Sequence, residues 1–508
     1  MELSYIKNFF SSYFNESLKN KKYLVLYALF VLVTALSMLS LNNYYNPKFE
    51  IIIFLLVLFI GIFLINFYTK HTKELHKVAF LVIICFGICS VLLTPILDVC
   101  DEQEHFTRAE LTSKGDFFPQ NNENGFKTIQ GTLDLIGNSE STIFETDVDT
   151  KSINHTTVNV SSVFQQNPFF GYLASGIGVF LAKLLDLNLI WMLWIGRFFN
   201  ILLYATLVSV AVKKSPILKI PLIIMAAIPS AVYQGASMSI DAVIFGVGIV
   251  VVAYFFNMIK SKDFSVGKKE LAIFSSLCII LGLCKLPFLA FIFLLILVPK
   301  NKFSVNKYLY GLLCIIIVSI IGLIWSSYYA IPSLTNSYRM EYYIVNNVSA
   351  SGQINYILSN IPESIVLISD LPNYLTSITE NTFYFSYEGN NYGSKFIDSI
   401  YPMFIGGICL LYPYKNQISN KLRIGVFLIV TLIFSGTYMI QYLTWSPVGS
   451  DIIFGTQFRY FIPLFSLFPF VFGINNNTNR NEKIDMIIMI ITIGFLGAGM
   501  LATSFNCY

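Results

Sequence analysis

The feature that most constrains this sequence is a series of apolar runs that recur along its whole length. Each run has about 17 to 23 residues, enough to cross a hydrocarbon core of about 30 Å at about 1.5 Å per residue. Of the 508 residues, 55% are hydrophobic and only 12% are charged. That charged share is about half the usual share of a soluble domain. The sequence therefore predicts an all-α integral membrane protein that crosses the bilayer many times.

The apolar runs predict about 13 transmembrane helices. We assign them to 23–41, 50–67, 77–97, 189–212, 217–236, 241–259, 270–286, 287–299, 308–329, 396–413, 423–443, 458–473 and 484–503. The chain then divides into an N-terminal segment with three spans (1–97), a first loop (98–188), central spans (189–329), a second loop (330–395) and C-terminal spans (396–508).

The distribution of lysine and arginine predicts the orientation of the spans. Basic residues collect in short loops such as 260–269 and 300–307, which is typical of the cytoplasmic face. With the N-terminus inside, all the basic loops fall on that face, provided that the apolar segment 167–187 does not cross. We therefore expect 167–187 to be an interfacial or re-entrant helix and both large loops to face outward. The dispersed basic residues form no patch for nucleic acid, and the eight scattered cysteines indicate no zinc site or disulfide framework.

The first predicted outward loop begins with a dense group of ionisable residues, "DVCDEQEHFTRAE". If a helix begins at Asp101, then Asp101, His105 and Arg108 share one face, and Glu102 points to a neighbouring one. Such a group beside lipid is either an idle hydrated boundary or a functional site, and its density favours a site. A carboxylate there could act as a general base through partial burial, or Arg108 could hold it ionised. The sequence does not decide between these effects.

Three further residues are predicted at the outer ends of later spans. Asp241 follows a predicted bend around Pro229, and it is interpreted as a helix N-cap, a site residue or both. Lys285, in "CKLPFLAF", either binds a lipid phosphate or extends to the interface. Arg459, in "GTQFRYFIPL", has the same geometry and a planar fork suited to phosphate. Together with the acids, these cations predict a site for an anionic lipid-linked substrate.

Arg197 lies about three turns inside a predicted span, where an unpaired charge is costly. We therefore expect it to have a structural partner. Metal dependence is open, because Asp101, Glu102, His105 and Asp241 could bind a divalent ion but no ligand spacing requires one.

Five motifs, "LDVCDEQEHFTRAELTSKGDFFP", "GYLASGIGVFLAKLLDLNLIWMLWIGRFFNILLY", "IPSAVYQGASMSIDAVIFGVG", "CKLPFLAF" and "GTQFRYFIPLF", follow one another in this chain. Their order and approximate spacing resemble a bacterial family of multipass membrane proteins, the domain of unknown function 2142. That family resembles the GT-C superfamily of glycosyltransferases, whose members take sugars from polyprenyl phosphates. The resemblance implies a GT-C-like fold in the bacterial cytoplasmic membrane, with its active face extracytoplasmic.

By the same resemblance, Asp101 matches the catalytic acid, Glu102 its neighbour, and Asp241 the acid near the outer end of a later span. The implied activity is inverting transfer of a sugar to a cell-envelope glycan, lipid or polymer. His105, Arg108, Asp241, Lys285 and Arg459 are then expected to bind substrate, with Lys285 and Arg459 on the departing phosphate.

Two other functions stay open. A transporter or flippase of a lipid-linked saccharide could use the same charges to bind a headgroup, although no internal repeat or midplane charges are evident. A surface-polysaccharide polymerase or ligase with a diphosphate-linked donor fits nearly as well. The sugar, the acceptor and the oligomeric state are not predicted.

Overall fold

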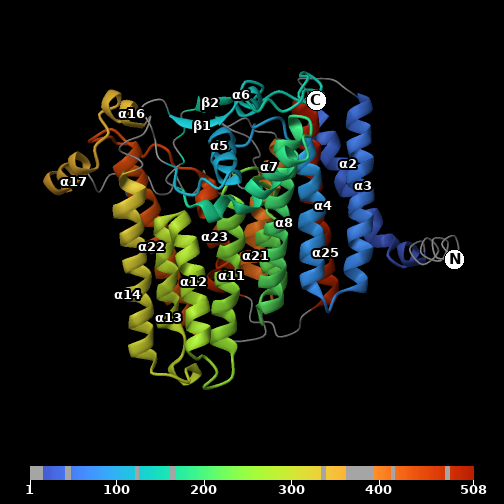
Figure 1. Cartoon of the computed structure of the whole chain (residues 1–508). Coiled ribbons are helices and arrows are strands. Elements are labelled where there is room, and N and C mark those ends of the chain that lie inside the picture. Colours follow the sequence, from blue (N-terminus) through green and yellow to red (C-terminus); the bar gives the residue numbers. More distant parts are fainter. Residues whose placement is uncertain are drawn as a thin grey trace.

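A computed structural model gives the architecture of the chain (Figure 1). It describes residues 15–39, 47–119, 125–160, 162, 164, 167–332, 339–361, 394–413, 418–474 and 481–508.

Among these residues, eight helices are long and apolar enough to cross a membrane. They are α2 (Lys21–Met38), α3 (Pro47–Lys70), α4 (Leu75–Leu93), α8 (Ile190–Lys214), α11 (Asp241–Lys260), α14 (Lys307–Trp325, continued by the π-helical turn η5, Ser326–Ala330), α22 (Asn420–Trp445) and α25 (Glu482–Cys507). Each corresponds to one predicted span. The all-α membrane class is thereby supported, whereas the count of 13 spans is not established.

The other five predicted spans are shorter or interrupted helices in the structure. Two are helices of 17 residues, α12 (Lys268–Cys284) and α21 (Lys395–Leu411). Three are divided into pieces: α9 (Lys219–Ala226) with α10 (Pro229–Gly235), η3 (Leu286–Phe293) with α13 (Leu294–Leu297), and η7 (Phe458–Phe461) with α23 (Ile462–Phe465) and α24 (Phe468–Phe472).

Proline accounts for these interruptions. Pro229, Pro287, Pro463 and Pro469 each lie in the first turn of a piece, where the missing N–H costs no helical hydrogen bond. The predicted bend around Pro229 is confirmed.

The centre of the molecule is α11, which is buried over 89% of its most apolar window, followed by α25 at 83%. The long helix α8 packs against α4, α7 and α11. By contrast, α14 is buried over only 11% of its window and lies at the edge of the bundle, as Figure 1 shows. A helix as apolar as α14 and so little covered by protein is expected to face lipid.

The first loop folds over one end of the helices, which we call the loop end (Figure 1). It contains α5 (Glu102–Ser113), β1 (Phe126–Ile129), α6 (Gln130–Ile136) and β2 (Thr157–Val160), followed by η2 (Phe169–Tyr172) and α7 (Leu173–Leu184). The two strands pair antiparallel, with Phe126 opposite Val160. The basic turn between α3 and α4, and the loop that carries η4 (Lys300–Lys302), lie at the opposite end.

Helix α7 occupies the segment that we predict to be interfacial. Its 12 residues extend about 18 Å, too short to cross a bilayer core. Leu173, Ile177, Phe180 and Leu184 form an exposed apolar face, whereas the opposite face packs on α5 and α8. A Cβ on Gly178 would lie 2.6 Å from the backbone of Gly196, so this contact requires glycine. An interfacial position stays a prediction that this geometry fits.

Only part of the second predicted loop, 330–395, is among the described residues. It contains α16 (Arg339–Val345) and α17 (Ala350–Ser359), which lie beside the loop end of α22.

Candidate functional site

The site begins where α4 gives way to α5. Helix α4 ends at Leu93, two residues before Pro95, and α5 begins at Glu102. Leu97 and Asp101 both have left-handed backbone, with φ of 50° and 61°. Aspartate tolerates this conformation better than most residues, and such positions cluster at functional sites. The Asp101 side chain does not cap α5, so its carboxylate is directed elsewhere.

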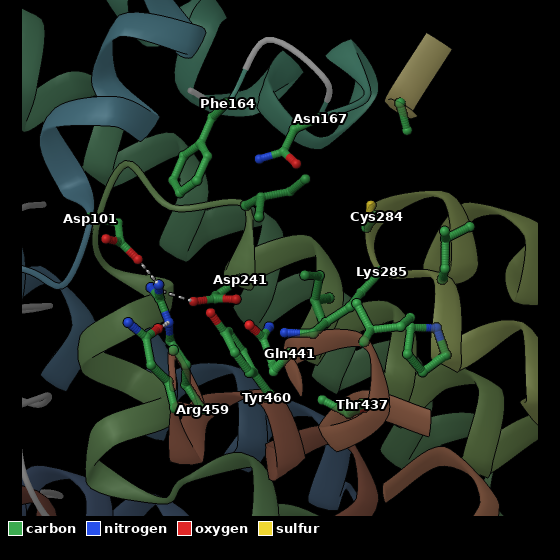
Figure 2. Close-up of a pocket in the computed structure, with 18 of the residues that line it drawn as sticks. Asp101, Phe164, Asn167, Asp241, Cys284, Lys285, Thr437, Gln441, Arg459 and Tyr460 are labelled. Carbon is green, nitrogen blue, oxygen red and sulfur yellow. Dashed lines mark hydrogen bonds and ion pairs between the residues drawn. The ribbon is translucent and has the colours of Figure 1, made fainter. Parts of the chain in front are cut away.

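The Asp101 carboxylate forms an ion pair with Arg459. The Arg459 guanidinium forms ion pairs with Asp101 and, at 3.2 Å, with Oδ2 of Asp241 (Figure 2). It also donates to the backbone oxygen of Cys100 at 3.0 Å and to Oε1 of Gln457 at 2.6 Å. Only 4% of Arg459 is exposed. One buried cation therefore joins the first loop, α11 and η7.

Asp241 is the first residue of α11, and the N-cap is Ile240. The predicted N-cap role of Asp241 is therefore wrong by one position. Its carboxylate still lies in the first helical turn, where a negative charge is favourable. The ion pair with Arg459 leaves Asp241 as a site residue.

Lys285 lies on the other side of the same site, between α12 and η3. Its ammonium stands 2.6 Å from the centre of the Tyr460 ring, a cation–π contact. Among the described residues Lys285 has no ion pair or side-chain hydrogen bond, although Asp241 and Arg459 are close enough to act on its charge. The Lys285 nitrogen therefore has unused hydrogen-bond donors facing the site.

A cavity of about 440 Å³ joins these groups. Asp101, His105, Asp241, Lys285 and Arg459 all border it, from α5, α11, η7 and the turn between α12 and η3. Figure 2 shows Asp101, Asp241, Lys285 and Arg459 in this arrangement. The structure therefore brings five of the seven predicted site residues together. Other walls come from α22 and the end of α14, where polar side chains such as Gln441 alternate with apolar ones such as Ile440 and Trp325.

His105 contributes a neutral imidazole to this cavity. The Tyr172 hydroxyl lies 2.7 Å from Nδ1 of His105 and accepts from the Asn167 amide at 2.9 Å. Among the described residues, Tyr172 has no other acceptor for its one hydrogen, so it donates to Nδ1. This arrangement leaves the imidazole hydrogen on Nε2. Burial, with the Arg459 charge nearby, lowers the pKa of His105 to about 3.

Asp101, unlike His105, is held in its charged form. Burial raises the pKa of the Asp101 carboxyl, but the Arg459 guanidinium and neighbouring hydrogen bonds outweigh burial and hold the pKa below its usual value. The carboxyl is therefore ionised at neutral pH. Of the two effects that the sequence left open, pairing with a cation prevails, but the cation is Arg459, not Arg108.

Glu102 forms its ion pair with Arg197 on α8, not with Arg459. Its two oxygens bind Nε and Nη2 of Arg197 at 2.8 and 2.6 Å, and Oε1 also accepts from the Met238 backbone. Both side chains are fully buried. Arg197 in turn donates to the backbone oxygens of Thr94 and Pro95 at the end of α4. The predicted structural pairing of Arg197 is confirmed, and Glu102 stabilises the turn that presents Asp101.

Arg108 is not among the residues that border the 440 Å³ cavity. Fully buried, it donates to Thr112, to the backbone oxygen of Phe117 and to that of Asn167. It therefore ties α5 to the segment that carries Asn167, the partner of Tyr172. The shared face predicted for Asp101, His105 and Arg108 fails because Asp101 lies outside the helix in left-handed backbone.

A second cavity of about 260 Å³ adjoins Asp101. Its lining is acidic, with Asp98, Glu102, Glu104 and Glu140 beside Asp101. Burial, and next the charge of Glu102, raise the pKa of Asp98 to about 6. Asp101 is the residue that the two cavities have in common.

No group of three His, Cys, Asp or Glu side chains arranged to hold a metal ion occurs in the described parts of the chain. Between Asp101 and Asp241 the counter-charge is the Arg459 guanidinium.

Sequence reasoning missed four residues that shape the site: Tyr172, Gln441, Gln457 and Tyr460. Tyr460 and Gln457 flank Arg459 in "TQFRYF", so their place beside a charged site residue was a usable signal. Tyr172 and Gln441 carry no such signal, because each joins the site only through tertiary packing.

No curated protein and no solved structure matches the chain. At the level of families, the DUF2142 profile, described as a predicted membrane protein, matches residues 84–468. That region contains every site residue named above. The chain belongs to the DUF2142 family of predicted membrane proteins.

Proposed function

We propose that the protein is a membrane glycosyltransferase of the inverting type. It transfers a sugar from a polyprenyl-phosphate-linked donor to a cell-envelope glycan, lipid or polymer at the outer face of the bacterial cytoplasmic membrane. The observation that carries the proposal is that the Asp101 carboxylate and the cations of Lys285 and Arg459 border one cavity between apolar helices. The resemblance of the motifs to GT-C glycosyltransferases supports the same reaction.

The larger cavity suits the donor. Lys285 has free donors and Arg459 offers a planar fork, which together bind a phosphate. Apolar side chains such as Ile244, Leu286 and Ile440 line the rest of the cavity and fit an isoprenoid chain.

The smaller cavity suits the acceptor, because Asp101 borders both spaces. An acceptor hydroxyl there lies next to the base, while the donor lies on its other side. The acidic lining repels anions, so we assign this space to a hydroxyl group in a neutral part of the acceptor.

In the reaction, Asp101 takes the proton of the acceptor hydroxyl, and that oxygen attacks the anomeric carbon. The bond between this carbon and the phosphate oxygen breaks, and its electron pair leaves on the polyprenyl phosphate. Lys285 and Arg459 neutralise the developing negative charge. Attack from the side opposite the phosphate inverts the anomeric configuration.

The ion pair between Arg459 and Asp101 must loosen for this step, because a carboxylate held by a guanidinium is a weak base. The donor phosphate competes for the same guanidinium. Donor binding thus frees Asp101, so that the base becomes effective only when a sugar is present to receive the acceptor oxygen.

Glu102 and Arg108 enter this proposal as positioning residues. Glu102 with Arg197 fixes the turn that presents Asp101, and Arg108 fixes the segment of Asn167 behind His105.

The test is transfer by Asp101→Asn protein from a purified polyprenyl-phosphate sugar in membranes of defined lipid. We expect the variant to bind the donor but to transfer no sugar. Full transfer by Asp101→Asn protein contradicts the assignment. Movement of intact donor across the bilayer without transfer, in the wild type, would identify a flippase.

A further inference from the structure

The cavity continues from its charged end along α22. Thr437, Gln441, Thr444 and Trp445 line it, and their spacing places them on one face of that helix. The other residues of this part of α22 are largely apolar. A polar stripe inside a membrane-spanning helix is costly and usually marks a functional surface.

The two threonine hydroxyls are satisfied by their own helix. Thr437 donates to the backbone oxygen of Ile433 at 2.8 Å, and Thr444 donates to that of Ile440 at 2.7 Å. Their presence therefore requires no ligand.

The side-chain oxygen of Gln441, unlike the two threonine hydroxyls, has no partner on its own helix. Only 7% of the residue is exposed, yet its Oε1 has no hydrogen-bond partner among the residues that the structure describes. Of the described residues that border the cavity, Gln441 alone has a buried side-chain oxygen or nitrogen in this condition. A buried acceptor without a donor is rare in proteins, so this oxygen is a candidate to accept a hydrogen bond from a bound molecule.

Gln441 is flanked by bare backbone and by flat apolar side chains. Gly455, with φ of 72°, brings bare backbone against Trp445 and Gln441; a Cβ there would lie 2.9 Å from the indole and 3.2 Å from Oε1. Trp325, at the end of α14, borders the same cavity. Figure 2 shows Gln441 and Lys285 both pointing into the cavity.

These features restrict the chemistry of the ligand. A carbonyl oxygen only accepts, so the ligand must supply a hydroxyl or amide hydrogen. An ionised phosphate and an isoprenoid chain have none. A sugar ring has hydroxyls at its edge and a face of C–H groups, which packs on an indole.

We propose that Gln441, Trp325 and Trp445 form a subsite for the neutral sugar ring of the lipid-linked donor, beside the Lys285 and Arg459 subsite for its phosphate. This inference rests on the proposed function and names the part of the cavity that recognises the sugar. Gln441 accepts a hydrogen bond from the ring, and the two indoles cover its apolar face. Gln441 is thus a determinant of which sugar is transferred.

The test compares a synthetic polyprenyl phosphate with its glucosyl, mannosyl and N-acetylglucosaminyl esters, binding to the full chain in nanodiscs. Tryptophan fluorescence reports on the cavity directly, because the chain has four tryptophans and Trp191→Phe with Trp194→Phe leaves only those at the proposed subsite. We expect at least one glycosylated lipid to bind about tenfold more tightly than the bare lipid.

Gln441→Leu, which keeps the approximate size of the side chain, should abolish this gain and leave affinity for the bare lipid unchanged. Thr437→Val is the matched control on the same helical face and should retain the gain. Melting temperatures of both variants show whether they are folded. Three results would overturn the subsite. They are a gain that persists in Gln441→Leu, an equal loss of affinity for the bare and the glycosylated lipid, and no gain for any of the three sugars.

The outcome separates this inference from the proposed function. If sugar transfer occurs and Gln441→Leu leaves binding and transfer unchanged, the subsite falls and the transferase stands. If the gain depends on Gln441 but no transfer to any acceptor follows, the transferase falls and the subsite stands.

Discussion

Arg459 holds the carboxylate of Asp101 in an ion pair although 358 positions separate the two residues. Asp241 lies on the same guanidinium. Removing the Arg459 guanidinium leaves both acids without the ion-pair partner that they share.

We therefore expect Arg459→Met to lower the free energy of unfolding by about 3–5 kcal/mol, as for a buried pair that loses one partner. Adding Asp101→Asn to Arg459→Met should recover part of this loss, because one of the stranded charges is removed. Thermal unfolding of the single and double variants in detergent measures the coupling. Additive losses would mean that the ion pair contributes no free energy of its own.

The ion pair of Glu102 with Arg197 predicts that loss of Glu102 affects stability more than loss of Asp101 does. Both side chains are fully buried and bidentate, so Glu102→Gln should destabilise the protein by about 3–5 kcal/mol. Asp101→Asn should abolish transfer with a much smaller effect on stability. Unfolding and transfer measured on both variants distinguish a positioning residue from a catalytic one. A stable Glu102→Gln protein without activity would restore the predicted catalytic role.

The acid limb of the pH–rate profile should lie at different pH for the free protein, which kcat/KM reports, and for the donor complex, which kcat reports. In the free protein Arg459 holds the pKa of Asp101 below its usual value, so kcat/KM should persist to about pH 4 or lower. A bound donor phosphate takes up part of the Arg459 charge, which raises the pKa of Asp101. The acid limb of kcat should therefore lie at higher pH than that of kcat/KM. Coincident limbs would show that the donor leaves the ion pair intact.

The sequence predicts which charged residues gather at the site better than it predicts the residues that each of them contacts. Asp101, His105, Asp241, Lys285 and Arg459 meet at one cavity because apolar runs and charge bias place them all at one end of the helices. Eight of the predicted spans can also be read from the sequence, since long apolar runs form long helices.

The rest depends on tertiary packing. The orientation of Arg108 depends on the left-handed backbone at Asp101, which no periodicity reveals. The segments around Pro229, Pro287 and Pro463 are apolar enough to be counted as whole spans, and only the structure shows that each is divided into short helices. Gln441 carries no special signal, because an isolated glutamine in an apolar helix has a partner more often than not.

Burial, with the Arg459 charge nearby, keeps His105 neutral and predicts how stability changes with pH. The imidazole pKa is about 3 in the folded protein, against 6.5 for the ordinary value. Between these values the unfolded chain binds more protons, so the free energy of unfolding falls as the pH is lowered below 6.5. This group alone should cost roughly 2 kcal/mol between pH 6.5 and pH 5.

His105→Gln should lack this part of the pH dependence. Melting temperatures of both proteins at pH 7 and pH 5 measure the difference. An equal decrease in the two proteins contradicts the buried neutral imidazole.

Lys285 combines a cost to stability with a function. Its ammonium faces the cavity with a cation–π contact to Tyr460 but no ion pair or hydrogen bond among the described residues. Lys285→Met keeps the stem and removes the charge, so we expect thermal stability to be unchanged or raised by about 1 kcal/mol, as at other sites kept for function. Affinity for a polyprenyl phosphate should fall about tenfold or more, because a phosphate loses its nearest unpaired cation. Lys285→Arg, which retains the charge, should keep most of the affinity. A loss of stability in Lys285→Met with unchanged lipid affinity would assign Lys285 to packing on Tyr460 instead of phosphate binding.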